Sequence, residues 1–322
     1  VSTLTAAFVT DDGLLRLCPG VTDYCGDFSW EIACTTSHIV AIIINIFHIV
    51  ILKKMNNELT FSLLNILMNI SLADILSSFS LIIKINCAIH HLSDGKPRLI
   101  TALLSASTDV GPVSRVYILA LAAWERIVAM CYSQDYQTHV LVSRNMVCIA
   151  SMWLFVTAAV FLRDFIFNET HCLTAILGVG NYYAVEPKAI IFTLMLIPTL
   201  VIGVLVVILA RKQRGVQGLI DAGEQSTILR QNYADTKYVL ILCVLFYISY
   251  LPTLMSFVLL FLKIKFLVFN WVIVLMFAIY GVGNIALYGV LSQAYQQQIL
   301  KSCGLHGTTS TAPNSQIVET VI

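Results

Sequence analysis

Charged residues are scarce in this sequence. Only 11% of the 322 residues are Asp, Glu, Lys or Arg, whereas 58% are apolar and the mean hydropathy is +0.84. A soluble domain of this length needs about a quarter of its residues charged to cover its surface. The shortage of charge therefore excludes an ordinary soluble protein and indicates one compact domain covered largely by lipid.

Other missing features exclude further classes of protein. No segment supplies the basic stripe that phosphate binding needs, and the formal net charge is +1, so nucleic acid is not expected as a partner. Seven prolines and sixteen glycines are too few for a fibrous or disordered chain. The N-terminal segment lacks a basic region followed by an apolar run, so no cleavable signal peptide is expected.

Patterns that carry catalysis are also absent. The sequence has no His-Glu-x-x-His metal spacing, no glycine-rich phosphate loop and no nucleophile elbow. His90 and His91 form a pair without further ligands nearby, and the stretch 267–291 has no lysine for a retinal Schiff base. We therefore expect neither enzyme activity nor a cofactor or metal.

Long apolar stretches are what the sequence has instead. A helix crosses a bilayer with roughly 20 apolar residues and satisfies its own backbone hydrogen bonds there. Membrane strands would show turn signals about every ten residues, and these stretches lack them. The sequence thus predicts an all-α membrane protein, a seven-transmembrane helix bundle. Its spans are 33–53, 60–86, 100–132, 145–167, 188–210, 237–262 and 267–291.

The orientation of the bundle follows mainly from one glycosylation sequon. Asn168-Glu169-Thr170 lies between the fourth and fifth spans and can be glycosylated only in the lumen or outside the cell. Basic residues are slightly more numerous on the opposite side, which agrees with this orientation. We expect an extracellular N-terminal segment at 1–32, a transmembrane domain at 33–291 and a cytoplasmic helix and tail at 292–322.

The third span has an unusually polar first half. Ser105, Thr108, Asp109 and Arg115 all fall within it. Such a helix must face protein or water rather than lipid, so we place it at the centre of the bundle.

Landmark residues occur in order along the seven spans. They are Asn45, Leu72-Ala73-Asp74, Glu125-Arg126-Ile127, Trp153, Pro198, Tyr250-Leu251-Pro252 and Asn284-Ile285-Ala286-Leu287-Tyr288. With this series the sequence resembles the rhodopsin-like (class A) family of G-protein-coupled receptors from the first span to the seventh. The resemblance implies a multi-pass receptor of the plasma membrane, which transmits binding of an extracellular small molecule to a heterotrimeric G protein.

The resemblance also implies roles for several residues in coupling. Glu125 and Arg126 resemble the acid-arginine pair that opens to a G protein, and the alternative is that Arg126 only reaches to the interface. Proline bends a helix, so Pro198 and Pro252 are expected pivots. Coupling and switching are expected to involve Glu125, Arg126, Tyr250, Pro252, Asn284 and Tyr288.

Polar residues at mid-membrane depth must find partners. Asn45, Asp74 and Asn284 lie on three different spans, and a shared polar cluster is the natural solution. Arg115 precedes Arg126 by about three helical turns, where family members usually carry a small polar residue beside a sodium ion. We expect Arg115 and Asp74 to form an ion pair, with the guanidinium in place of the sodium. The alternative is that Arg115 alone reaches a water-filled ligand cavity.

Two further departures from the family concern the seventh span and the cysteines. Ile285 stands where the family has proline, so a straighter helix is expected. The usual third-span cysteine is missing, so Cys172 is expected to pair with Cys87, with Cys18 or Cys25 as alternative partners. Cys303 is a candidate for palmitoylation or a free thiol.

The ligand-binding candidates are Lys84, Thr108, Asp109 and Tyr250. An amine ligand is not supported, because Asp109 lies one residue beyond the register of the amine-binding aspartate. Lys84 and Asp109 either neutralise each other or contact ligand. Tyr250 before Leu251-Pro252 resembles odorant receptors, including divergent fish-type ones. The alternatives are a receptor for a non-odorant ligand and a membrane transporter or channel subunit that uses the intramembrane charges.

The C-terminal region carries further candidate contacts. Residues 293–303 can form a short amphipathic eighth helix on the membrane, with Tyr295, Ile299 and Leu300 as expected lipid contacts. Basic residues at 211–214 are expected to contact a G protein or the anionic inner leaflet. Hydroxyl residues in the tail suit phosphorylation and arrestin binding, and the end Glu319-Thr320-Val321-Ile322 suits a PDZ domain; a plain disordered tail is the alternative.

Overall fold

The computed structural model of the chain describes residues 28–55, 60–89, 98–132, 136–167, 185–221, 227–261, 267–291 and 293–302. Within these ranges all regular structure is helical. The elements are α1 (Phe28–Lys54), α2 (Phe61–Ile89), α3 (Arg98–Cys131), η1 (Tyr136–Thr138), α4 (Val140–Ser143), α5 (Asn145–Phe167), α7 (Val185–Asp221), α8 (Thr227–Phe261), α9 (Leu267–Leu291) and α10 (Gln293–Ser302).

The apolar character of these helices supports a membrane protein. Five of the described helices contain stretches long and apolar enough to cross a membrane, namely Ile32–Lys54, Phe61–Ile82, Asn145–Arg163, Ala189–Gly218 and Asn232–Met255. A shorter apolar stretch, Ile279–Val290, lies in α9. The all-helical membrane class is therefore confirmed for the described part of the chain. The full count of seven spans and the extracellular N-terminus stay predictions.

Two helices extend well beyond the predicted spans. The structure continues α7 to Asp221 and begins α8 at Thr227, whereas the predicted spans end at 210 and begin at 237. Hydropathy identifies only the part of a helix that suits lipid, and the polar residues that follow Ala210 still form good helix. The predicted eighth helix is present as α10.

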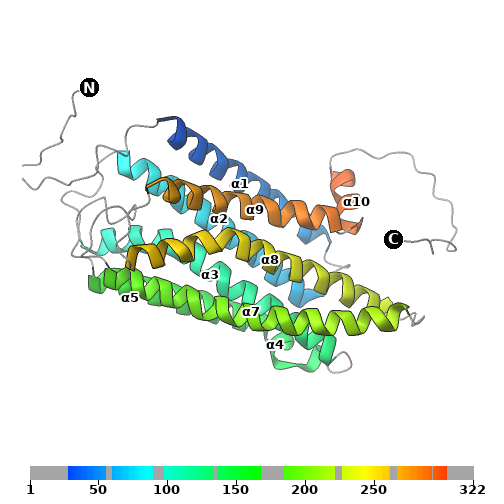
Figure 1. The fold of residues 1–322 in the computed structure, drawn as a ribbon. Coiled ribbons are helices and arrows are strands. Elements are labelled where there is room, and N and C mark those ends of the chain that lie inside the picture. The colour runs from blue at the N-terminus through cyan, green and yellow to red at the C-terminus, as the bar shows by residue number, and fades with distance from the viewer. Residues whose placement is uncertain are drawn as a thin grey trace, which may run out of the picture.

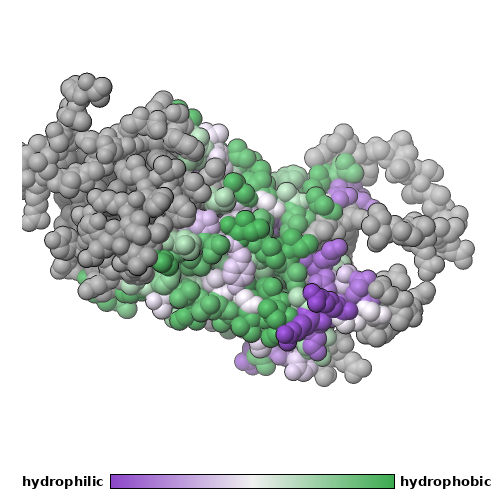
Figure 2. All heavy atoms as spheres, viewed as in Figure 1, coloured by the Kyte–Doolittle hydropathy of each residue, from purple (hydrophilic) through white to green (hydrophobic). Residues whose placement is uncertain are grey.

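The long helices run alongside one another as a bundle, and α4 and α10 lie toward the same end (Figure 1). We call this end, which holds Arg126, Arg144 and Lys301, the inner end. The central element is α3, because it packs against α2, α5, α7 and α8. Its predicted central place is confirmed, and Gly111 to Val116 are all buried. Between the ends, the described surface in Figure 2 is mainly hydrophobic.

A close approach of backbones brings α2 and α3 together near the polar half of α3. A Cβ atom added to Gly111 would lie only 2.6 Å from the backbone N and the Oγ of Ser77. Only glycine fits this contact. Arg115 lies one turn beyond Gly111 on α3, and Asp74 lies one turn before Ser77 on α2, so the approach places these two residues opposite each other.

Candidate functional site

A buried ion pair joins α2 and α3 in the middle of the bundle. The guanidinium Nη2 of Arg115 contacts the carboxylate Oδ1 of Asp74, and both side chains are only 1% exposed. Opposite charges at this depth are far less costly together than apart. The expected ion pair is therefore present, and Arg115 does not reach a water-filled cavity alone.

Two tyrosines from other helices complete the surroundings of Arg115. The guanidinium carbon lies 4.8 Å from the ring centroid of Tyr280 on α9 and 5.8 Å from that of Tyr250 on α8. The Tyr250 hydroxyl donates a hydrogen bond of 3.3 Å to the Pro112 carbonyl of α3. Aromatic faces attract a cation, most strongly where water is excluded. One arginine thus contacts α2, α8 and α9 from α3.

Asn45 approaches the same region from α1. A Cβ atom on Gly281 of α9 would lie 3.3 Å from Nδ2 of Asn45 and 3.6 Å from Oδ2 of Asp74. Asn45 and Asp74 therefore both face α9 at this glycine. The predicted cluster forms only in part, because Asn284 lies one turn further along α9 and accepts a 2.5 Å hydrogen bond from the Tyr238 hydroxyl of α8.

A chain of aromatic contacts runs from α8 to α10 near the inner end. The Tyr288 ring lies 4.6 Å from that of Tyr238 and 4.9 Å from that of Tyr295. The Tyr295 hydroxyl lies 2.6 Å from Nδ1 of His48 on α1, and Tyr295 is fully buried. The expectation that Tyr295 contacts lipid is wrong, because this hydroxyl finds a buried partner on α1. Leu300 is 48% exposed, as expected of a lipid contact.

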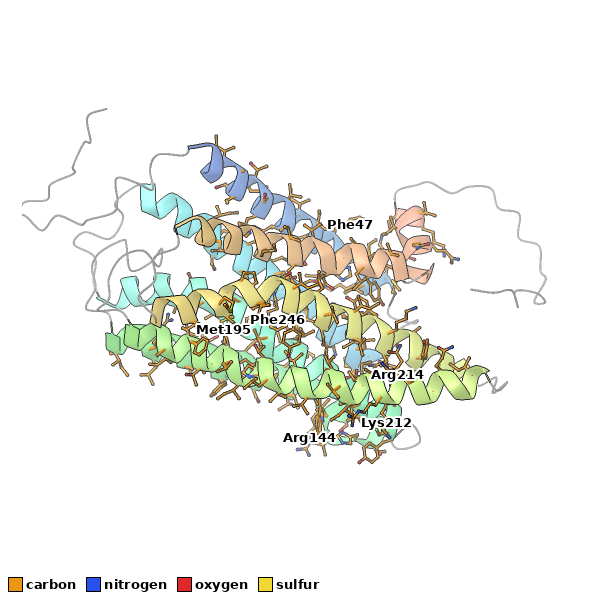
Figure 3. The ribbon with its side chains drawn as sticks, viewed as in Figure 1. Phe47, Arg144, Met195, Lys212, Arg214 and Phe246 are labelled. Atoms are coloured by element: carbon orange, nitrogen blue, oxygen red, sulfur yellow. The ribbon has the colours of Figure 1, made fainter. Side chains whose placement is uncertain are left out.

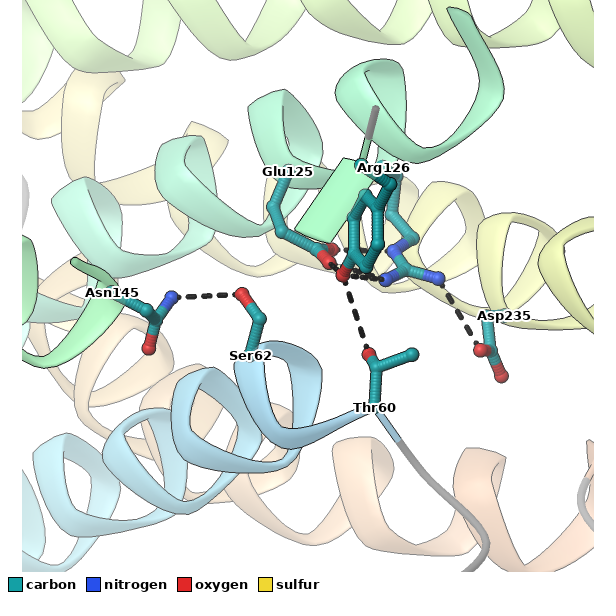
Figure 4. A network of polar contacts seen from close by, with 7 residues as sticks. Thr60, Ser62, Glu125, Arg126, Asn145 and Asp235 are labelled. Carbon is teal, nitrogen blue, oxygen red and sulfur yellow. Dashed lines mark hydrogen bonds and ion pairs between the residues drawn. The ribbon is translucent and has the colours of Figure 1, made fainter. Parts of the chain in front are cut away.

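The inner network is a set of polar contacts at the inner end of α3 (Figure 4). Arg126 Nε donates a 2.5 Å hydrogen bond to Glu125 Oε2, and its Nη2 contacts the other carboxylate oxygen. Arg126 Nη1 lies 3.3 Å from Oδ2 of Asp235 on α8. Both Glu125 and Arg126 are fully buried. Arg126 is therefore not an arginine that merely reaches to the interface, since carboxylates from two helices hold it inside the bundle.

Tyr136 of η1 closes the inner network from the loop after α3. Its hydroxyl donates to Glu125, lies 3.3 Å from Arg126 Nη2 and lies 3.4 Å from the Thr60 hydroxyl. Burial, and then the nearby charge of Glu125, raise the pKa of Tyr136 to about 12. The phenol therefore stays protonated at physiological pH and remains a donor to Glu125. Next to it, Asn145 of α5 donates a 3.0 Å hydrogen bond to Ser62 of α2.

The other membrane-depth carboxylate of α3 has a partner that the sequence did not suggest. Asp109 Oδ2 lies 2.8 Å from Arg163 Nη2 of α5. Arg163 therefore neutralises Asp109. The side chains of Lys84 and Thr108 lie outside the described part of the chain. Tyr250, the remaining ligand candidate, is 1% exposed between Arg115 and Phe246, so a ligand reaches it only if neighbouring side chains move.

The predicted modification sites fall mostly outside the described residues. This applies to glycosylation at Asn168 and to the cysteines Cys18, Cys25, Cys172 and Cys303, whereas Cys87 belongs to α2 but its side chain is not described. Another sequon of the sequence, Asn69-Ile70-Ser71, lies inside α2, where the Asn69 side chain accepts a 3.0 Å hydrogen bond from Trp153. A helical asparagine bonded in this way is no glycosylation acceptor, and the contact gives Trp153 a structural role.

Sequence reasoning missed several partners in these clusters. Asp235, Tyr280 and His48 were not singled out, because each finds its partner on a helix far away in sequence. Tyr136 was not singled out either, although its partners Glu125 and Arg126 lie only 11 and 10 residues before it. Arg163 could have been singled out from the sequence, because a lone cation within an apolar stretch needs a partner.

Taken together, the described ion pairs connect α3 to α2, α5 and α8, and the inner network lies between α3 and α8. No protein-family model matches the sequence, and no curated protein matches it either.

Proposed function

We propose that this chain is a seven-helix G-protein-coupled receptor of the plasma membrane. In this proposal it transmits binding of a small extracellular molecule, of chemosensory or odorant type, to a heterotrimeric G protein at the inner end. The observation that carries the proposal is Arg126. It is a fully buried arginine held by Glu125 beside it and by Asp235 across the contact between α3 and α8.

The position of Asp235 relative to Pro252 supports a switch at this contact. Proline removes a backbone hydrogen bond from α8 and makes Pro252 a natural pivot. Asp235 lies about 25 Å from Pro252 along the helix. A rotation of about 10° at the pivot moves Asp235 by roughly 4 Å at that distance. The 3.3 Å contact with Arg126 then breaks, and Arg126 becomes available to a partner.

The ion-pair cluster connects this pivot to the outer half of the bundle. Tyr250 precedes Pro252 by two residues and packs against Arg115. A ligand that enters between the outer halves of α3, α7, α8 and α9 and shifts Tyr250 therefore acts on α8 beside its pivot. Its preference for the state with α8 moved outward sets the efficacy.

Ligand-independent G-protein dissociation tests the proposal without knowledge of the ligand. We would express the surface-tagged chain and compare Asp235→Asn and Arg126→Ala with wild type at equal surface level, across the main G-protein subtypes. Loss of the Asp235 charge favours the open state, so basal activity should rise by about three- to tenfold for a contact worth roughly 1 kcal/mol. Arg126→Ala should abolish it.

A matched control comes from the other carboxylate pair of α3. Asp109→Asn also removes a charge paired with an arginine, but far from the inner end, so basal activity should stay within about twofold of wild type. If neither inner-end variant changes dissociation of any subtype at equal surface level, the receptor proposal is wrong. Electrophysiology on the same cells would then test the chain as a transporter or channel subunit.

A further inference from the structure

The exposed charges that the structure describes share one sign. Among the side chains that the structure describes, every exposed charged residue is a lysine or arginine. The described acidic side chains are buried or partly buried, and each takes part in an ion pair. The densest group of exposed cations is the basic patch, formed by Arg211, Lys212 and Arg214 on α7 and Lys237 on α8.

The two halves of the basic patch lie at the same level. The helices α7 and α8 pack against each other in opposite directions, and the Tyr247 hydroxyl of α8 donates a 2.5 Å hydrogen bond to the Thr199 carbonyl of α7. From this contact Lys237 lies about 15 Å toward the inner end, and Arg211 lies about 18 Å toward it. Hydrophilic side chains gather at this end of the bundle in Figure 2, and Figure 3 shows Lys212 and Arg214 there.

The patch lies on the lipid-facing side of both helices. Exposed apolar residues recur on α7 at helical spacing and lead directly into Arg211; they are Leu200, Val204, Val207 and Ile208. On α8 the exposed residues Leu251, Ile248 and Val244 lead into Lys237 at the same spacing. Asp235, which faces Arg126, is turned about 200° around α8 from Lys237. The patch therefore faces away from the inner network.

The depth of the patch matches the headgroup region. The apolar stretch Ala189–Gly218 has 30 residues, whereas a hydrocarbon core of about 30 Å takes roughly 20 helical residues. Counted from Ala189, the core ends near Ile208, so Arg211 to Arg214 follow at the level of phosphate groups. The cations Lys53 and Lys54 end the lipid-facing stripe of α1 in the same way.

We propose that the basic patch binds the headgroup of a polyanionic phospholipid, of the phosphatidylinositol bisphosphate type, in the leaflet at the inner end. Four exposed cations at about one depth on two adjacent helices suit a headgroup with several phosphate charges, and juxtamembrane cations each attract anionic lipid. The lipid-facing stripe excludes a protein that docks on the inner network as the occupant. This inference rests on the membrane helices and does not depend on the proposed receptor function.

Lipid retention by the purified full chain tests the inference. The chain in detergent would be titrated with phosphatidylinositol bisphosphate, phosphatidylserine or phosphatidylcholine, and bound lipid counted by native mass spectrometry. The wild type should retain the bisphosphate lipid best and phosphatidylcholine least. The double variant R211Q/K212Q should weaken bisphosphate binding by at least about tenfold, since each cation contributes about fivefold.

The chain offers a control with the same loss of charge. K53Q/K54Q removes two adjacent exposed cations from the same end, and it should weaken binding by less than about threefold. The charge-preserving swap R211K/K212R should bind as wild type does. Equal losses in the two double variants would mean general attraction without a site and would overturn the inference. Unchanged retention of the bisphosphate lipid in R211Q/K212Q would also overturn it, since the patch would then not be the place where this lipid binds.

Discussion

At the level of single residues, Arg115 carries a charge at a position that water does not reach. Its cost is offset by the carboxylate of Asp74 and by the faces of Tyr250 and Tyr280. Removal of either charged partner would leave the other charge buried without compensation. The residue is therefore a structural tie between four helices as well as a candidate element of a switch.

A double-mutant cycle measures how much the ion pair between Arg115 and Asp74 contributes to stability. Arg115→Met should destabilise the purified protein by about 3–5 kcal/mol, because the Asp74 carboxyl group is then buried without its partner. The double variant Arg115→Met/Asp74→Asn should recover much of that loss, since neither charge remains. The check is the thermal midpoint of unfolding in detergent for wild type, both single variants and the double variant. Additive losses would show that the two side chains do not depend on each other.

Tyr136 should make stability sensitive to alkaline pH. Its pKa is raised in the folded protein from 10.0 to about 12, so folding favours the protonated phenol. The resulting contribution to stability is complete below pH 10 and is lost as the pH rises from 10 to 12. Thermal midpoints measured across this range should fall less steeply for Tyr136→Phe than for wild type. Tyr132→Phe, at an exposed position close by, should keep the steep fall of the wild type.

At the level of helices, the surroundings of a glycine show whether two elements approach each other closely there. Gly111 brings α3 against α2, whereas a Cβ atom on Gly215 near the end of α7 would meet nothing within 4 Å. The two positions share a helical backbone and differ only in their surroundings. They therefore separate the effect of helix propensity from the effect of packing.

Substitution of both glycines by alanine tests this reading of the packing. Gly111→Ala forces α2 and α3 apart and should cost about 1–3 kcal/mol, with a lower thermal midpoint. Gly215→Ala should leave the midpoint unchanged or raise it slightly, because alanine favours helix by up to about 1 kcal/mol. A tolerated Gly111→Ala would mean that the approach of the two helices is looser than 2.6 Å implies.

The positions of the helices could largely be predicted from hydropathy. Each of the seven predicted stretches coincides with a described helix, because a run of apolar residues leaves a membrane chain no other way to satisfy its backbone. The helix ends beyond Ala210 and before Lys237 were missed, since these residues are polar and follow propensity rather than hydropathy. The burial of Tyr295 among other ring side chains was not predicted, because an amphipathic pattern does not say which face of the helix meets lipid.

At the level of the whole molecule, α3 connects an outer pair, a central pair and an inner network. Asp109 with Arg163, Arg115 with Asp74, and Arg126 with Asp235 follow one another along this helix. A movement of α8 disturbs the contact between Arg126 and Asp235. It also displaces Tyr250, whose ring lies beside Arg115 of the central pair. Under the proposed function, a signal passes from the central pair to the inner network, and the outer pair takes no part in it.

The central pair leads to a prediction about sodium. Because the Arg115 guanidinium already neutralises Asp74, basal and ligand-driven G-protein dissociation should not change when external sodium is replaced by a large organic cation. Arg115→Ser would open a small polar space beside the carboxylate, and this variant should gain a sodium dependence of about twofold or more. A sodium dependence in the wild type would show that Asp74 is open to ions despite Arg115.

The sequence by itself determined that the chain is helical, that it belongs in a membrane and which residues carry charge at depth. These follow from local composition, because lipid imposes its demand on each helix separately. The expected contact of Arg115 with Asp74 also came from the sequence, since two opposed charges at one depth have few other partners. Only the tertiary structure decided which helix faces which. It paired Asp109 with Arg163, placed Asp235 and Tyr136 on the Glu125-Arg126 pair and left Arg211 and Lys237 exposed, because these arrangements depend on how the segments of the chain pack together.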